Sequence, residues 1–485
     1  MEEIKGALAR LAVDHLPRIL MVSHGIGGGV ERHINELIEL LDGRAHVLLL
    51  EPVAGRRELR LTLPVLSGGS PGLRLAYRWP KDAEVFWQLL NWLSFSRMHI
   101  HHVQGFPADF LAQLQNFGLE YDLTLHDHSI FTGHASLVNS RGVFDSNWLK
   151  QGLDYLPVGD KYLAQNLQRL ALSAGRVIVP SAQLQQAIQH LLPDIAQSVC
   201  LLHRAHPDAE CAEAYPQPYL RPLAKREPLR VLCLGMLSIE KGAGVLAQVA
   251  KQAYATGALI EFILLGGCHV PLPKAVERLG SYADTQVQEL IRDIDPHLVW
   301  LPAQCPETWS YTLSVAFKAG LPVLTSAVGV FPERLQCRPL SWQCEHYADA
   351  QQWLDELLKI RGLHFAGLDA GFWSWQPPCA FYLKLPSGLL ASEDLERAYW
   401  QLSGERQWVG EQPALVEQSL RVAYKRANRG AAKWRMGLLA FLIWLRSSGW
   451  LVPFVHLIPY RWQQVVKRLI TREPIAERRK PGKLK

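Results

Sequence analysis

The feature that most limits the fold of this chain is a succession of strand, glycine-rich loop and helix that occurs in its first half and starts again in its second. Arg18 to Ser23 (RILMVS) is a short apolar run typical of a buried strand. Gly27 to Gly29 follow, and apolar residues then recur at helical spacing from Val30 to Leu41. Leu229 to Gly235 (LRVLCLG) begins the pattern again. Such units build parallel sheets covered on both faces by helices, so we expect an α/β protein.

The chain is long enough for more than one domain. Its 485 residues exceed what a single core ordinarily holds. The stretch from His203 to Pro228 holds five prolines, as interdomain linkers often do. The α/β pattern ends near Leu385, and a polar, helical pattern follows. We therefore expect a first Rossmann-like domain, a linker, a second Rossmann-like domain and a helical extension, in residues 1–206, 207–228, 229–385 and 386–485.

A histidine stands where a strand of the first domain ends. Tyr121 to Leu125 has the character of a buried strand, and His126 and Asp127 come directly after it. Ligands of open α/β sheets bind at the carboxyl ends of the strands. An imidazole there could orient a hydroxyl or move a proton, which makes His126 a candidate catalytic residue.

The histidines also allow a metal-site interpretation. His126, His128 and His134 alternate along the chain and could share a face, but no cysteine or acidic cluster completes a ligand set. His101 and His102 end a neighbouring strand, and we expect them to pack or to face an acceptor without taking part in chemistry. No bound metal and no cofactor are therefore expected.

The stretch from Pro302 to Arg334 predicts a loop, a helix and a strand suited to an anionic ligand. Glu307 to Ser310 has the residue types of a helix start, and Gly320 with Pro322 ends the helix. The first backbone N–H groups of a helix have no partner within it and favour phosphate. The expected phosphate-binding positions are the first residues of this helix, Ser310, Tyr311 and Thr312.

This stretch resembles the C-terminal signature of the retaining glycosyltransferases of family 4, which have the GT-B fold. The resemblance is carried by Glu307, by the turn Gly320 to Val323, and by Gly329 and Glu333. In that family a second Glu follows the first after seven residues and usually holds the ribose. Here that position is Val315.

The loop from Gly235 to Gly242 (GMLSIEKG) is similar to the diphosphate loop of the same family. Lys241 matches the lysine of that loop, while the arginine position is Met236. The glycine loop at Gly27 to Gly29 also resembles the N-terminal loop that faces the donor diphosphate and the acceptor. The resemblance covers about Arg18 to Arg334.

The resemblance implies a GT-B enzyme that transfers a sugar, with retention and without a bound metal, from a nucleotide-diphosphate sugar to a glycan or lipid-linked acceptor. A membrane-associated tail would suit a lipid-linked acceptor in cell-surface polysaccharide assembly. Glu307 would position the sugar, His126 would reach donor and acceptor, and Glu333 with Arg334 would stabilise the loop near the donor. Diphosphate binding would fall to Gly27, Gly28, Gly29, Lys241, Ser310, Tyr311 and Thr312.

Two other functions fit parts of the sequence. Met236 and Val315 suit a glycosyltransferase-like protein that binds a glycan or a partner without catalysis. Gly25-x-Gly27 with Glu51 at the end of the next strand suits a nicotinamide-dependent enzyme, although Val30 replaces the third glycine. The pair Asp293-x-Asp295 is expected to be a turn or helix cap rather than a metal site.

The basic charge of the chain lies in its C-terminal tail. Arg461 to Lys485 holds nine Lys or Arg and two Glu, a balance of +7, whereas the whole chain is +6. With the tryptophans nearby, residues 434–485 suit an anionic membrane surface better than nucleic acid. Eight cysteines without a C-x-x-C pair favour a reduced compartment. We therefore expect a cytoplasmic protein that associates peripherally with the inner face of a membrane.

Overall fold

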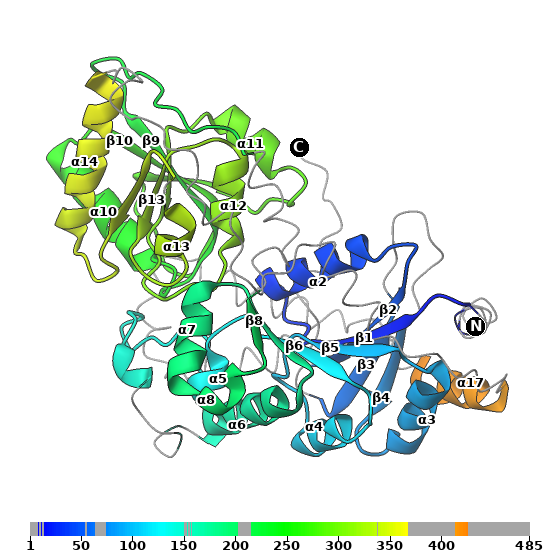
Figure 1. The fold of residues 1–485 in the computed structure, drawn as a ribbon. Coiled ribbons are helices and arrows are strands. Elements are labelled where there is room, and N and C mark those ends of the chain that lie inside the picture. Colours follow the sequence, from blue (N-terminus) through cyan, green and yellow to red (C-terminus); the bar gives the residue numbers. More distant parts are fainter. Residues whose placement is uncertain are drawn as a thin grey trace.

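The chain folds into two α/β domains, each built on its own sheet (Figure 1). The structure is a computed structural model, and it describes residues 14–53, 56–63, 74–149, 158–201, 215–336, 338–366 and 413–424, with the single residues Leu8, Leu11, Leu153 and Leu156. The expectation of two sheet domains is confirmed.

The first sheet has eight strands within the described ranges, in the order β4-β3-β2-β1-β5-β6-β7-β8. They are Arg74–Arg78 (β4), Glu58–Thr62 (β3), His46–Pro52 (β2), Arg18–Val22 (β1), Arg97–Ile100 (β5), Tyr121–Thr124 (β6), Arg176–Val179 (β7) and Val199–Leu201 (β8). The expectation that these strands are all parallel is wrong at one edge, because β3 pairs antiparallel with both β2 and β4. Residues 53–57 alone separate β2 from β3, too few for the crossover that a parallel pair needs.

Helices cover both faces of this sheet. They are Gly29–Leu40 (α2), Ala83–Leu93 (α3), Ala108–Gln115 (α4), Ser129–Thr132 (α5), Val158–Ser173 (α6), Ala182–Leu191 (α7) and Pro193–Ala196 (α8), with a 3-10 turn at Ser146–Leu149 (η1). Helix α2 packs Ile34, Leu37 and Ile38 against one face. Helices α3 and α4 contribute to the larger core on the other face, for example through Phe86 and Phe110. Each of these helices is therefore held by its apolar side rather than by propensity alone.

The starts of three neighbouring strands are joined by a buried carboxylate. Asp122 of β6 is fully buried and accepts hydrogen bonds from Arg97 of β5 at 3.1 Å and from Arg176 of β7 at 3.1 Å. Two guanidinium groups compensate the one carboxylate, as a buried charge requires. This cluster lies at the amino ends of the strands and fixes β5, β6 and β7, whose opposite ends carry the histidines.

The second sheet is parallel and has the doubly wound order β11-β10-β9-β12-β13-β14. Its strands are Val276–Gly280 (β11), Ile260–Cys268 (β10), Leu229–Leu237 (β9), Leu298–Leu301 (β12), Val323–Ser326 (β13) and Ser341–Cys344 (β14). Its helices are Ala243–Thr256 (α10), Val287–Ile294 (α11), Tyr311–Lys318 (α12), Phe331–Leu335 (α13) and Ala350–Ala366 (α14). One apolar cluster lies under α10 and α14 and another under α11 and α12.

A late segment of the chain returns to the first domain. Residues Pro413–Ser419 (α17) lie beside α3, and the π-helical turn Leu420–Tyr424 (η5) lies beside β4 (Figure 1). Leu415, Val416 and Leu420 are buried in the core of the first domain. Residues 413–424, which belong to the extension predicted at 386–485, are therefore helical and pack on the first domain.

The membrane prediction rests on residues 434–485, which lie outside the described residues. In the part of the chain that the structure describes, no helix combines the length and apolar character needed to span a bilayer.

Candidate functional site

The site lies where the carboxyl ends of the two sheets approach each other. The hydroxyl of Tyr311, at the start of α12, donates to the Glu36 carboxylate of α2 at 2.8 Å. A Cβ atom added to Gly29 would lie 3.6 Å from the Tyr311 ring. Thr308 donates to the backbone carbonyl of His126. The glycine loop and His126 of the first domain are thus next to the helix start of the second.

Lys241 and Glu307 form an ion pair at this site. Lys241 Nζ lies 3.0 Å from Glu307 Oε1, and the lysine side chain is half-exposed while the glutamate is mostly buried. The Glu307 carboxylate raises the pKa of Lys241 above its ordinary value, so the lysine stays positively charged over the physiological range. The sequence placed both residues in one site, and the structure brings them into contact.

The loop that carries Lys241 is shaped by a glycine at its end. Gly242 has a φ of 86°, and a Cβ atom there would lie 2.0 Å from the carbonyl oxygen of Pro302. Only glycine allows both the left-handed backbone and this approach. The loop therefore packs tightly on the end of β12, the strand that leads to Glu307.

Ser310 begins α12 in a left-handed conformation, with φ 70° and ψ 84°. It occupies the N-cap position, in agreement with the predicted helix start, but its side chain makes no cap bond. Arg334 holds the loop instead, donating to the carbonyls of Trp309 at 2.8 Å and Ser310 at 2.9 Å. It also donates to the Ser314 hydroxyl, and its guanidinium lies 4.1 Å from the Trp309 ring centroid. The helix start is thus a strained backbone stabilised by a buried arginine.

Glu333, the neighbour of Arg334, acts on the other domain. Its carboxylate accepts hydrogen bonds from the backbone N–H groups of Ala182 and Gln183, both at 3.0 Å. These are the first residues of α7, whose N-cap Ser181 accepts from Leu184 as the sequence predicts. Arg334 supports the loop near the predicted donor site. Glu333 instead joins the two domains by capping a helix.

The two departures from the family pattern have different surroundings. Val315 is 3% exposed and belongs to the apolar cluster under α12. Met236 is 52% exposed at the end of β9, with its side chain against Gly267 of β10. A valine therefore suits position 315, because this position faces an apolar core. Position 236 is exposed and open to a ligand.

His126 lies in a group of histidines from three elements. Its Nε2 atom is 3.1 Å from Nδ1 of His101, and its ring centroid is 5.0 Å from that of His33 on α2. Burial, together with the neighbouring histidines, holds the pKa of His126 well below its ordinary value. Burial lowers the pKa of His33 to about 4. Both rings are therefore neutral at physiological pH.

The sequence did not predict this grouping. The sequence predicts that His101 packs without a chemical role, yet its ring contacts His126. Nothing in the sequence pattern marked His33 as a neighbour of His126. Among the described residues, one group of three histidines has its ligand atoms within 4.8 Å of one another. It consists of His33, His101 and His126, not of His126, His128 and His134. His134 stacks on Trp148 instead. The available signal was the strand-end position that His101 and His126 share on adjacent strands.

His102 and Asp127 form a second pair beside this group. His102 Nε2 lies 3.3 Å from Asp127 Oδ2, and the Ser129 N–H donates to the same carboxylate group. Burial opposes ionisation of Asp127, but the hydrogen bonds from His102 and Ser129 outweigh it and hold its pKa below the ordinary value. Asp127 is therefore an anion that orients His102 and the turn after β6.

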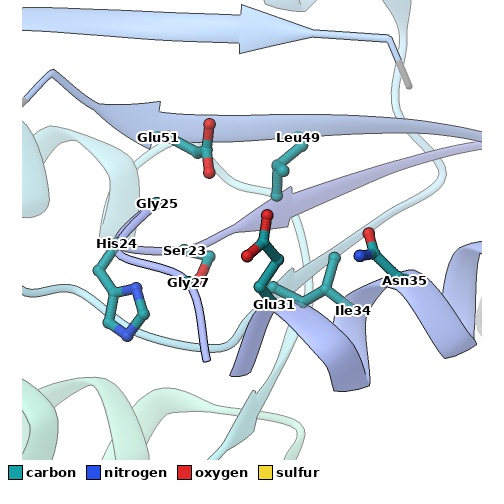
Figure 2. Close-up of a pocket in the computed structure, with 9 residues that line it drawn as sticks. All are labelled: Ser23, His24, Gly25, Gly27, Glu31, Ile34, Asn35, Leu49 and Glu51. Carbon is teal, nitrogen blue, oxygen red and sulfur yellow. The ribbon is translucent and has the colours of Figure 1, made fainter. Parts of the chain in front are cut away.

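A pocket of about 300 Å³ opens beside the first glycine loop (Figure 2). Its lining comes from α2 and β2 and from the loop between β1 and α2: Ser23, His24, Gly25, Gly27, Glu31, Ile34, Asn35, Leu49 and Glu51. Figure 2 shows the Glu31 and Glu51 side chains directed toward the same space, while the His24 ring points away. Glu51 also lies 3.6 Å from Arg60. Two carboxylates suit hydroxyl or amino groups of a ligand better than phosphate.

Asp295 behaves as the sequence predicts. It is the C-cap of α11 with a φ of 48°, and its carboxylate pairs with Arg221. This residue has a structural role, and the pair Asp293-x-Asp295 lies on α11 and its cap.

Similarity to known proteins is confined to solved structures. No protein-family model matches the chain, and no curated protein does. Similar solved structures include a sucrose-phosphate synthase from Thermosynechococcus elongatus, with 15% identity, 80% of this chain and 100% of that chain covered, and a TM-score of 0.47. They also include HepE from Anabaena in complex with UDP and glucose (14% identity, 80% and 99% covered, TM-score 0.46). A third is the pneumococcal O-GlcNAc transferase GtfA in complex with UDP and GlcNAc (12% identity, 80% and 99% covered, TM-score 0.44).

Proposed function

We propose that this protein is a glycosyltransferase that moves a sugar from a nucleoside-diphosphate donor to a hydroxyl of a glycan acceptor. The observation that carries the proposal is the Lys241–Glu307 pair, with Nζ and Oε1 3.0 Å apart, at the meeting point of the two domains. Thr308, the neighbour of Glu307, donates to the backbone carbonyl of His126, and the helix start at Ser310 follows two residues later. A cation, a carboxylate and a helix start are what transfer from a diphosphate requires.

The leaving diphosphate is the group that gains charge as the sugar is released. Lys241 and the N-terminal backbone of α12 are in place to stabilise that charge, and fixed donors of this kind ordinarily contribute most to catalysis. A phosphate that binds Lys241 competes with Glu307 for the ammonium. Glu307 is then available to accept hydrogen bonds from sugar hydroxyls.

The acceptor belongs to the first domain in this proposal. The pocket beside Gly25 and Gly27 opens at the carboxyl ends of β1 and β2 and offers the carboxylates of Glu31 and Glu51. Carboxylates accept hydrogen bonds from sugar hydroxyls. His126, whose backbone carbonyl accepts from Thr308 beside Glu307, is neutral and can orient the attacking hydroxyl.

The test is transfer and hydrolysis measured with a panel of nucleotide sugars, comparing the wild type with Glu307→Gln. We expect turnover with at least one donor and a loss of about 100-fold or more in kcat for the variant, since a single stabilising contact in an active site is worth that much. Glu289→Gln is the matched control, because Glu289 is an exposed carboxylate on α11 of the same domain. Turnover that survives Glu307→Gln would remove Glu307 from the mechanism.

Two alternatives are separated by the same panel. Binding of nucleotides without turnover of any donor would favour a non-catalytic glycan- or partner-binding protein. Binding of a nicotinamide cofactor, followed by its fluorescence, would favour the dehydrogenase alternative. The proximity of Glu51 to Gly25 is the geometry that the latter would use.

Retention and a lipid-linked acceptor are finer parts of the proposal. The resemblance of Glu307 and the Gly320 turn to family 4 supports retention, which the anomeric configuration of the first product would test. The basic, tryptophan-containing sequence of residues 434–485 supports work at an anionic membrane surface. A chain lacking residues 450–485 should then bind anionic liposomes more weakly than the full chain, and equal binding would count against the membrane proposal.

A further inference from the structure

Three imidazoles converge at the carboxyl edge of the first sheet. His33 comes from the middle of α2, His101 directly follows β5, and His126 lies two residues beyond β6. Their ligand nitrogens all lie within 4.8 Å of one another. His33 and His101 are 2% and 1% exposed, and His126 is partly exposed. Residues far apart in the sequence thus bring three of the commonest metal-ligand groups to one point.

The geometry is close to what one ion needs. Zinc binds imidazole nitrogen at about 2.0–2.1 Å, so two nitrogens on one tetrahedral ion lie roughly 3.3 Å apart. Nδ1 of His101 and Nε2 of His126 are already 3.1 Å apart. One ring nitrogen of each of the three histidines lies within 4.8 Å of a ring nitrogen of the other two, so binding one ion requires only a local adjustment of the rings.

We propose that His33, His101 and His126 bind a divalent transition metal ion of the zinc class. The set is a three-histidine site, and such sites leave the fourth coordination position to water or to a ligand. His126 is the partly exposed member, so the fourth ligand reaches the ion from its side. Imidazoles without thiolate favour zinc, cobalt, nickel and copper over magnesium and calcium.

The surroundings support this assignment. Metal-binding imidazole must be neutral, and burial keeps His33 and His126 so. The His99 ring centroid is 4.0 Å from that of His101, and His99 itself is hydrogen-bonded to Thr124 at 2.7 Å. The carbonyl of His126 accepts from Thr308. These contacts position the strand end and the backbone that carry the His101 and His126 rings.

The metal site stands apart from the proposed sugar transfer. Its evidence is the three rings of the first domain, whereas the transfer proposal depends on Lys241 and Glu307 of the second. The resemblance to family 4 implies no metal, so the inference departs from it. Since His126 belongs to both proposals, metal binding is tested without an activity assay.

The experiment uses the full-length protein, freed of metal with a chelator and alkylated with iodoacetamide to block accessible thiols. Cobalt is added, and its visible absorption is followed, because tetrahedral cobalt absorbs strongly and thiolate ligands add a separate near-ultraviolet band. We expect one tight site with a tetrahedral spectrum and no thiolate band. Zinc should displace the cobalt and raise the melting temperature.

Variants then locate the site. His101→Gln and His33→Phe should each weaken cobalt binding by about 10-fold to 100-fold or more, since even an outer partner of a metal site is worth that factor. His190→Gln is the matched control, because His190 is exposed on α7, and it should bind as the wild type does. His33→Phe keeps the ring volume in case the glutamine variant fails to fold.

Three results would overturn the proposal. They are no cobalt or zinc binding by the folded wild type, a spectrum with thiolate ligands, or binding that is unchanged in both His101→Gln and His33→Phe. The first result would leave the three rings as a hydrogen-bonded imidazole network.

Discussion

The loops at the carboxyl ends of the two sheets meet at the site and carry different chemical groups. We call those of the first domain the first edge and those of the second domain the second edge. The edge of the second domain carries a charged pair, Lys241 with Glu307, and a helix start held by Arg334. The edge of the first domain carries neutral imidazoles and a pocket lined by Glu31 and Glu51. Both edges come from the same arrangement of parallel strands, in which the loops at the carboxyl ends bind ligands.

Under the proposed function, this difference divides the work of sugar transfer between the domains. A lysine and a helix start suit a diphosphate, which brings negative charge and takes it away as the leaving group. Neutral rings and carboxylates suit hydroxyl groups, which need orientation and a proton acceptor. The donor phosphate is therefore expected at the second domain and the uncharged sugar groups at the first. Substitutions at one edge, or at the contact between the two edges, test this division.

The largest expected effect comes from removing the ammonium group of Lys241, the cation of the second edge. Lys241→Met should lower kcat/KM for the nucleotide sugar by about 100-fold to 1,000-fold, because a fixed positive charge at the leaving group is lost. Steady-state kinetics with the donor found in the panel would measure this. Lys251→Met is the control, since Lys251 is exposed on α10 of the same domain. If Lys251→Met lowered kcat/KM as much as Lys241→Met does, the effect would not be specific to the site.

The next effect concerns the support of the helix start. Arg334→Met leaves the carbonyls of Trp309 and Ser310 and the hydroxyl of Ser314 without their donor, so we expect a loss of about 2–4 kcal/mol in the free energy of unfolding. Nucleotide affinity should fall as well, because Ser310 no longer holds its left-handed backbone. Denaturant titration and calorimetric nucleotide binding would measure the two effects.

Arg338 provides the matched comparison for Arg334. It bonds Leu321 and Ser341 and lies 4.4 Å from the Phe317 ring centroid, near the opposite end of α12. Arg338→Met should destabilise the protein without changing nucleotide affinity. Loss of affinity in both variants would mean that Arg334 acts through general stability alone.

The first edge should make stability depend on pH. Burial, with His102 close by, lowers the pKa of His24 from 6.5 to about 3 in the folded protein. As the pH falls below about 6.5, the unfolded chain takes up a proton that the folded chain does not, so the free energy of unfolding decreases. The expected slope from this group is about 1.4 kcal/mol per pH unit.

His24→Gln should make that stability curve flatter, while His190→Gln, on the surface of α7, should not change it. Urea unfolding of metal-free protein at several pH values would measure both curves. If the His24 variant kept the wild-type slope, the imidazole would not be neutral in the folded state.

The smallest effect is expected at the contact between the edges. Tyr311→Phe removes the 2.8 Å hydrogen bond to Glu36 but keeps the ring that lies 4.3 Å from the Arg32 guanidinium. We expect donor affinity to fall by about 2-fold to 10-fold, the range that one hydrogen bond of about 0.5–1.5 kcal/mol allows. Glu36→Gln should behave alike, and Glu39→Gln, on the exposed side of α2, should have no effect. If a variant with both Tyr311→Phe and Glu36→Gln lost no more donor affinity than either single variant, the two residues would belong to one contact.

Local sequence patterns were enough for most elements and for the second edge. The apolar run at Arg18 to Ser23 predicted β1, which is Arg18–Val22, and the helical spacing from Val30 to Leu41 predicted α2, which is Gly29–Leu40. Lys241 and Glu307 belong to short motifs, so their pattern could be read from neighbouring residues. The antiparallel pairing of β3 was missed because a run such as RELRLTLPV contains no information about the direction of its partner.

The first edge was harder to predict because its contacts join distant elements. His33 faces inward from a helix and His101 and His126 end two strands, and no local spacing relates the three. The same holds for Ser310, whose backbone is fixed by Arg334, a residue 24 positions away. What the sequence could show was that both strands end in histidine, and the sheet order then makes these ends neighbours.

The contact of Glu333 with α7 links the movement of the domains to the integrity of a helix. Two amide groups of Ala182 and Gln183 are satisfied by a carboxylate that belongs to the other half of the molecule. If the halves swing apart, those amides must find water and the first turn of α7 loosens. Amide hydrogen exchange at Ala182 and Gln183 would then act as a gauge of how often the two domains separate.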